Sequence, residues 1–273
     1  MSVIRNFLKK HTFPGLLLLI GGSMFFAEVL FVNLCGYILG SIGINPEPFS
    51  DIALIFGGFL SLFFFRCLFR KEYHPLPIWE NFGRSLRYAY PIYLIWVFIL
   101  GMYAFFAKGF PMATPDAEII MRSISAGLVE EIIFREISIS FLQKKWIWED
   151  RNMIIVAISA VIFGGFHLFN VFFGNSLVTV FFQVIICLLA GMFYGSIYIL
   201  NGNVWAVILL HSLHNIIVFS ERKLVVQEGI DLPQIMNIVY MFGFALLAVY
   251  GVFITLNDDD SEIRSLWKRI WRG

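Results

Sequence analysis

The apolar stretch at residues 117–142 is expected to place Glu130, Glu131 and Arg135 at membrane depth. An ionised residue at the centre of a membrane-spanning helix costs roughly 2.5–3.5 kcal/mol on translocon scales, so such residues face a hydrated cavity, pair with an opposite charge, or do chemistry. Residues four apart share a helical face, so we expect Glu131 to pair with Arg135, while Glu130 is rotated by about 100°. This pattern leaves one carboxylate free to act as a general base.

Two later apolar stretches add imidazole and amide side chains. His167 follows Phe163 by about one helical turn. His211 and Asn215 are four residues apart and share a helical face, and His214 is rotated by about 60° from His211. With the free carboxylate, these side chains supply a base, a group that orients its proton, and donors that can stabilise an oxyanion. Those are the parts required for water to attack an amide.

The same residue types leave other interpretations open. His167, His211 and a glutamate could hold a hydrolytic zinc ion with an open fourth position, although no His-Glu-x-x-His run is present. A proton relay through Glu28, Glu130 and His167 would instead belong to a transporter. Nucleophilic serine chemistry has weaker support, because Ser212 adjoins His211 but projects from a different helical face. The ion pair could also simply fix helix packing.

Three short motifs follow one another on separate apolar stretches: Glu130-Glu131-x-x-x-Arg135, Phe163-x-x-x-His167 and His211-x-x-x-Asn215. In this order and spacing the chain resembles the CAAX prenyl protease 2 and bacteriocin-processing family of intramembrane glutamic endopeptidases, also called the CPBP or ABI family. The resemblance covers about residues 123–219, and the expected number of spans extends it to the whole chain.

The resemblance implies a role for each motif. Glu130 and His167 would activate water, His211 and Asn215 would polarise the scissile carbonyl and hold the oxyanion, and the remaining charged pair of the first motif would support the site without a metal cofactor. The substrate would be a membrane-associated peptide or protein. The alternative is a non-catalytic bacteriocin-immunity or chaperone-like membrane protein whose polar cluster is structural.

Composition indicates an integral membrane protein. Of the 273 residues, 59% are hydrophobic and 14% are charged, whereas soluble domains average about 45–50% apolar residues. There is room for several spans of about 20 residues but not for a separate soluble domain, so we expect residues 1–273 to form one membrane domain. The net charge of +1, without a basic stripe, argues against nucleic acid as a partner.

The elements that must position the motifs are membrane helices. Apolar run lengths predict an all-α, polytopic bundle of about eight spans that encloses a polar cavity. The expected spans are residues 16–39, 52–68, 90–106, 117–142, 153–173, 177–200, 204–219 and 235–256.

The distribution of basic residues predicts the orientation in a cell membrane. With eight spans, the side that carries both termini would hold 15 of the 20 lysines and arginines, and the opposite side would hold only Lys108, Arg222 and Lys223. The positive-inside rule therefore places both termini in the cytoplasm. Residues 258–272 alternate apolar and charged side chains at helical spacing, which predicts an amphipathic helix on the inner leaflet.

Overall fold

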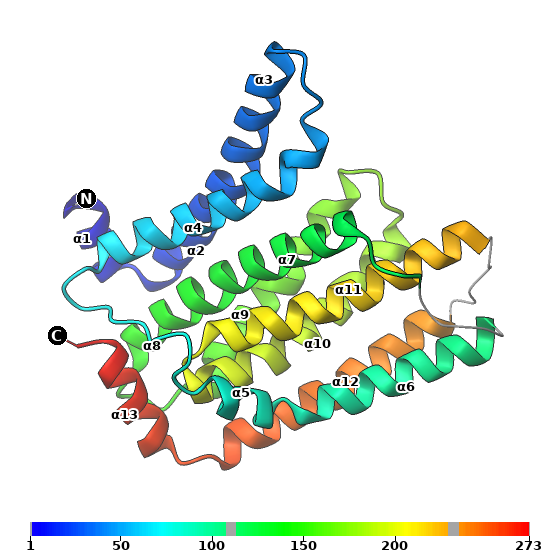
Figure 1. The fold of residues 1–273 in the computed structure, drawn as a ribbon. Helices are drawn as coiled ribbons and strands as arrows, with labels where there is room; N and C mark the ends of the chain where they lie inside the picture. The colour runs from blue at the N-terminus through cyan, green and yellow to red at the C-terminus, as the bar shows by residue number, and fades with distance from the viewer. Residues whose placement is uncertain (1, 108–112, 229–234, 273) are drawn as a thin grey trace.

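The structure is a computed structural model that describes residues 2–107, 113–228 and 235–272, so Lys108 lies outside the described residues. Within these ranges the chain is helical apart from its connections, and no strand is formed. Figure 1 shows long helices side by side, with both termini at one end of the bundle. The predicted all-α, polytopic bundle is confirmed. The assignment of that end to the cytoplasm stays a prediction.

The elements fall into three consecutive groups. The first contains α1 (Ser2–Lys10), α2 (Thr12–Met24), η1 (Phe25–Val32), α3 (Asn33–Ser41), η2 (Glu47–Phe49) and α4 (Ser50–Leu68). The second contains α5 (Phe82–Tyr88), α6 (Tyr90–Ala107), α7 (Ala117–Glu131), η3 (Ile132–Ile139) and α8 (Ser140–Trp146). The third contains α9 (Asn152–Phe166), η4 (His167–Val171), α10 (Leu177–Asn201), α11 (Val204–Glu228), α12 (Ile235–Asn257) and α13 (Asp260–Ile270). Elements η1 and η3 are π-helical, and η2 and η4 are 3₁₀ helices.

Length and apolarity identify fewer spans than the eight expected. Within the described ranges, six helical stretches qualify: Thr12–Ser41, Glu47–Leu68, Asn152–Val171, Leu177–Asn201, Val204–Glu221 and Met236–Asn257. The pair α5 and α6, bent by 51°, makes a seventh if it is counted as one span. The expected span at 117–142 does not qualify, although α7, η3 and α8 follow one another without a break. The reason is chemical, because four ionisable residues lie between positions 130 and 136.

Small residues hold α7 in the middle of the bundle. A Cβ atom added to Gly58 of α4 would lie 2.9 Å from Val129 Cγ2 of α7. On the other side, a Cβ atom added to Gly127 of α7 would lie 2.5 Å from Ser212 Oγ of α11. Glycine at these contacts lets neighbouring helices approach closely. The close packing of α7 on α11 fixes the distance between the first and third motifs.

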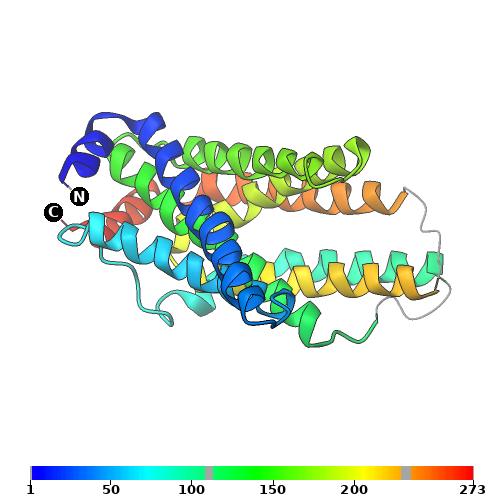
Figure 2. The same ribbon diagram turned by 90° about the horizontal axis from the view of Figure 1, so that it is seen from above.

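The C-terminal segment forms the predicted amphipathic helix, but α13 covers protein rather than the leaflet. Ile263 and Trp267 are buried. The indole of Trp267 donates a hydrogen bond to Ile199 O at 2.8 Å, and the indole of Trp271 donates to Ser140 O at 2.9 Å. Figure 1 and Figure 2 show α13, in red, at the end of the bundle that carries both termini. Carbonyl groups near the ends of α10 and α8 supply the acceptors for the two indoles.

This packing predicts a stability effect. We expect Trp267→Ala to lower the free energy of unfolding by about 3–5 kcal/mol, because it removes a fully buried indole. Trp79→Ala, at an exposed position, should cost about 1 kcal/mol or less. Chemical denaturation of the two variants in detergent micelles measures the difference. Equal, small losses would place α13 on the lipid surface instead.

Candidate active site

Glu131 joins the first motif to the third. Its side chain, at the end of α7, is 0% exposed. One carboxylate oxygen, Oε2, lies 3.0 Å from Arg135 Nε, and the other, Oε1, lies 2.7 Å from His211 Nδ1. The ion pair predicted from the spacing of four residues is therefore present. Its second contact, to an imidazole 80 positions later, fixes the ring of His211 at a carboxylate.

Glu130 faces the other nitrogen of the same imidazole. Its Oε2 lies 3.6 Å from His211 Nε2, and its side chain keeps 25% of its surface exposed. This separation is longer than a direct hydrogen bond. The two adjacent glutamates thus differ in environment. Glu131 is buried between Arg135 and His211, and Glu130 is partly exposed.

Arg135 is a fully buried cation held by two kinds of contact. Besides Glu131, it has the ring of Phe163 4.6 Å from its Cζ atom, which is a cation–π distance. Phe163 also lies edge-on to His167, with ring centroids 5.0 Å apart, and to His211, with centroids 6.2 Å apart. The first residue of the second motif therefore packs against both imidazoles. It also compensates part of the cost of burying the guanidinium.

His167 begins η4, where α9 ends, and its Nδ1 lies 2.9 Å from Phe163 O. The carbonyl can only accept, so Nδ1 carries the proton and Nε2 is left as the free nitrogen. Within the described ranges, no ion pair joins His167 to Glu130. Asn215 lies one turn beyond His211 on α11 and is half-buried. The structure therefore brings the two glutamates of the first motif to His211. His167 packs on Phe163, whose ring also contacts Arg135 and His211.

His214 does not take part in this contact set. Its ring packs edge-on against Phe244 at 4.9 Å and against Tyr240 at 6.1 Å, both on α12. The two histidines of α11 therefore face different neighbours. His211 contacts the glutamates of α7.

Sequence reasoning missed Tyr194 of α10, which stacks on His211. The two rings lie 5.3 Å apart at an angle of 19°, and Tyr194 is fully buried. Its hydroxyl has no hydrogen-bond partner among the described residues. A flat ring against a flat ring restricts rotation of the imidazole. The one available signal was a tyrosine in the middle of an otherwise apolar span.

Sequence reasoning also missed Glu136, a third acid on the same helix. Glu136 is buried and accepts hydrogen bonds from Tyr73 OH at 2.6 Å and from Tyr198 OH at 2.9 Å. Arg66 lies 3.7 Å from the same carboxylate. These contacts tie η3 to the end of the bundle that carries α13, so Glu136 serves the scaffold beneath the candidate site. The feature of the sequence that could have identified Glu136 is its position, five residues after Glu131 in the same apolar stretch.

The zinc alternative requires three converging ligands. Across the part of the chain that the structure describes, no group of three His, Cys, Asp or Glu side chains is placed to hold a metal ion. The two ring nitrogens of His211 face Glu131 and Glu130, and the Nδ1 atom of His167 is bonded to a carbonyl. The described residues therefore do not fit a zinc site.

A model of a known protein family matches the segment that contains the candidate site. Residues 114–217 match the family model described as type II CAAX prenyl endopeptidase Rce1-like. This segment runs from the residues just before α7 into α11 and contains all three motifs. No curated protein and no solved structure matches the chain. In this segment, which holds the contacts between Glu130, Glu131 and His211, the chain is similar to the Rce1-like family of type II CAAX prenyl endopeptidases.

Proposed function

We propose that the chain is an intramembrane endopeptidase that hydrolyses a peptide bond of a membrane-associated peptide or protein, with Glu130 as the general base. The observation that carries this proposal is the position of Glu130, 3.6 Å from His211 Nε2 and still partly exposed, beside a buried ion pair. A structural ion-pair knot would have no need for an open, second carboxylate at that place. The match of residues 114–217 to the Rce1-like family model supports a protease.

Charge balance suggests the resting state of the site. Glu131 and Arg135 neutralise one another, so the charge of Glu130 is left to be balanced. In the proposed scheme His211 carries a proton on each ring nitrogen, because the two nitrogens lie 2.7 Å from Glu131 and 3.6 Å from Glu130. Nδ1–H donates to Glu131, and Nε2–H faces Glu130 and the space where a substrate carbonyl would lie.

The proposed reaction uses these groups in two steps. Glu130, assisted in this scheme by His167, removes a proton from water, and the oxygen attacks the scissile carbonyl carbon. The carbonyl π electrons move to oxygen, where His211 Nε2–H and the Asn215 amide donate hydrogen bonds to the oxyanion. The C–N bond then breaks as the oxyanion collapses, and the proton held by Glu130 passes to the amine. No metal ion is needed in this scheme.

A comparison of membrane peptides tests the function and identifies substrates. Cells that carry the wild-type chain and cells that carry Glu130→Gln are fractionated, and their membrane peptides are profiled by mass spectrometry. We expect uncleaved precursors to accumulate in the variant. Identical profiles, together with unchanged protection of the cells against bacteriocins, would favour the non-catalytic immunity alternative.

Tyr194 offers a finer test of the geometry. We expect Tyr194→Leu to lower kcat about tenfold with little change in KM, because the stacked ring contributes about 0.5–1.5 kcal/mol to the orientation of His211. Tyr194→Phe keeps the ring and removes only a hydroxyl without a partner, so its kcat should stay within about twofold of wild type. Steady-state cleavage assays measure both. A Phe variant as impaired as the Leu variant would contradict a role for stacking.

A further inference from the structure

A separate pocket lies where α5 bends into α6, outside the residues of the candidate active site. Its volume is about 360 Å³, and it is lined by Arg84, Arg87, Tyr88 and Tyr250. Each lining residue carries a hydrogen-bond donor, and two of the four are permanent cations. No acidic residue lines it. A donor set of guanidinium and hydroxyl groups is suited to the oxygen atoms of a phosphate.

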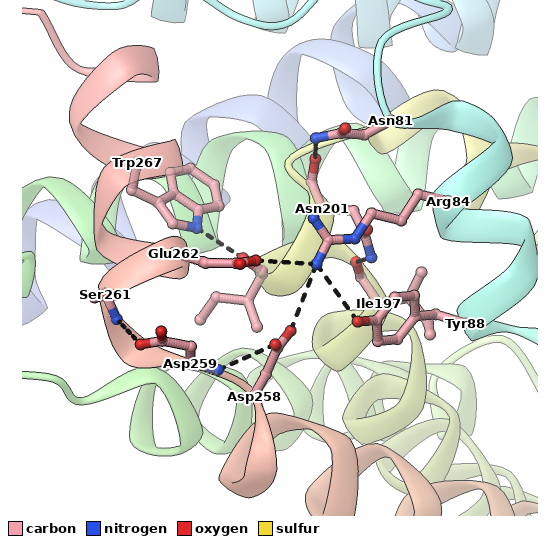
Figure 3. A network of polar contacts seen from close by, with 11 residues as sticks. Asn81, Arg84, Tyr88, Ile197, Asn201, Asp258, Asp259, Ser261, Glu262 and Trp267 are labelled. Carbon is pink, nitrogen blue, oxygen red and sulfur yellow. Dashed lines mark hydrogen bonds and ion pairs between the residues drawn. The ribbon is translucent and has the colours of Figure 1, made fainter.

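Arg84 separates this pocket from an acidic neighbour. Its Nη2 lies 3.5 Å from Glu262 and 4.0 Å from Asp258, and donates to Tyr88 OH at 3.4 Å. Figure 3 shows these contacts converging on one end of the guanidinium. Glu262 and Asp258 line a second pocket, of about 450 Å³, on the other side of Arg84. The two acids therefore hold Arg84 in place without entering the basic pocket.

Arg87 leaves a positive charge free at the pocket. Its side chain is exposed, and within the described ranges it makes no ion pair. Three other arginines at this end of the bundle, Arg84, Arg264 and Arg269, are each paired with an acid. The uncompensated positive charge of the pocket thus comes from Arg87, so Arg87 is the residue to substitute in a test.

Tyrosines near the pocket indicate a position at the bilayer interface. Tyr90 is the first residue of α6, and its ring lies edge-on to Tyr250 of α12 at 5.9 Å. Tyrosines concentrate at membrane interfaces, where the ring is buried and the hydroxyl reaches the headgroups. The arginines of α5 precede Tyr90 in the chain. They belong to the side that carries the termini, which the distribution of basic residues predicts to be cytoplasmic.

The surface next to the pocket is apolar. Gly243 lets α12 approach Ile95 of α6, and a Cβ atom added there would lie 2.9 Å from Ile95 Cγ2. The joined surface exposes Leu94 on α6 and Leu246 and Val249 on α12. A ligand that combines a phosphate with hydrocarbon chains would therefore find donors at its head and an apolar track beside its tails.

We propose that this pocket binds the headgroup of an anionic phospholipid from the leaflet on the side of the termini. Arg87 and Arg84 bind the phosphate oxygens, Tyr250 donates a hydrogen bond, and the acyl chains lie along α6 and α12. A basic pocket between membrane helices on the side facing anionic lipids is a known kind of headgroup site. The proposal does not depend on the proposed peptidase activity.

Lipid binding to the purified full-length chain tests the proposal. Dioleoyl-phosphatidylglycerol and dioleoyl-phosphatidylcholine are titrated separately into detergent micelles, and bound lipid is counted by native mass spectrometry. We expect the wild type to bind phosphatidylglycerol about tenfold more tightly, and Arg87→Gln to lose most of that preference. Arg70→Gln is the matched control, because Arg70 is exposed and also makes no ion pair within the described ranges; it should behave as wild type.

Three outcomes would overturn the assignment. Equal binding of the two lipids by the wild type would show that the pocket does not recognise the negative charge of the headgroup. Equal losses in Arg87→Gln and Arg70→Gln would reduce the effect to general surface charge. Displacement of bound phosphatidylglycerol by millimolar inorganic phosphate would assign the pocket to the free anion. Tyr250→Phe provides a second variant, with an expected loss smaller than that of Arg87→Gln.

Discussion

Glu130→Gln is expected to lower the kcat of peptide hydrolysis by about a hundredfold to ten-thousandfold, the usual contribution of a general base. The amide has the shape of the carboxylate but cannot take a proton from water. Glu130 is partly exposed and lies outside the buried ion pair, so the variant should fold as the wild type does. Single-turnover cleavage by the chain reconstituted in liposomes measures the effect. A prenylated CAAX peptide is the first substrate to try, because the family's description names it.

Glu118→Gln is the matched control for this experiment. Glu118 lies on the same helix, but it is exposed and pairs with Arg122 at 3.2 Å. Its replacement should leave kcat unchanged, because it is remote in sequence from the motif and faces solvent. Wild-type activity in Glu130→Gln would refute the role of Glu130. Loss in both variants would point to the integrity of α7 and not to a base.

The second large effect concerns the stability of the buried ion pair. Arg135→Met is expected to lower the free energy of unfolding by about 3–5 kcal/mol, because it leaves Glu131 charged and uncompensated in a site with 0% exposure. Arg122→Met, which breaks the exposed pair with Glu118 on the same helix, should cost about 1 kcal/mol or less. Chemical denaturation in micelles compares the two. A similar cost for both would mean that the pair at Glu131 is hydrated.

A double variant separates stability from catalysis. Arg135→Met with Glu131→Leu replaces the whole pair by apolar groups, so most of the lost stability should return. Activity should stay low, because His211 Nδ1 then has no carboxylate to orient it. Recovery of kcat along with stability would show that the pair serves the fold alone.

Local features of the fold could be predicted from the sequence because they depend on periodicity. The pairing of Glu131 with Arg135 follows from a spacing of four on a helix. Composition predicted the helical bundle, and the three motifs predicted the family. The count of spans was too high by the criterion of length and apolarity, because the stretch at 117–142 carries the very charges that mark the site.

The contacts between helices that are distant in the sequence could not be predicted in the same way. From the sequence alone, the apolar face of α13 could pack against lipid or against protein. The structure shows that the hydrogen-bond acceptors for its indoles come from α10 and α8. Tyr194 and Glu136 gained their roles from neighbours on other helices, so no short pattern identified them.

The sequence by itself determined which chemical groups are buried in the membrane and which of them share a helical face, since 3.6 residues per turn govern both. Only the tertiary structure decided which glutamate is buried at His211 Nδ1 and which stays open at Nε2. That choice depends on how closely α7 and α11 pack, and Gly127 against Ser212 sets the approach. The physical reason is that contacts between distant helices follow from the shapes of whole surfaces.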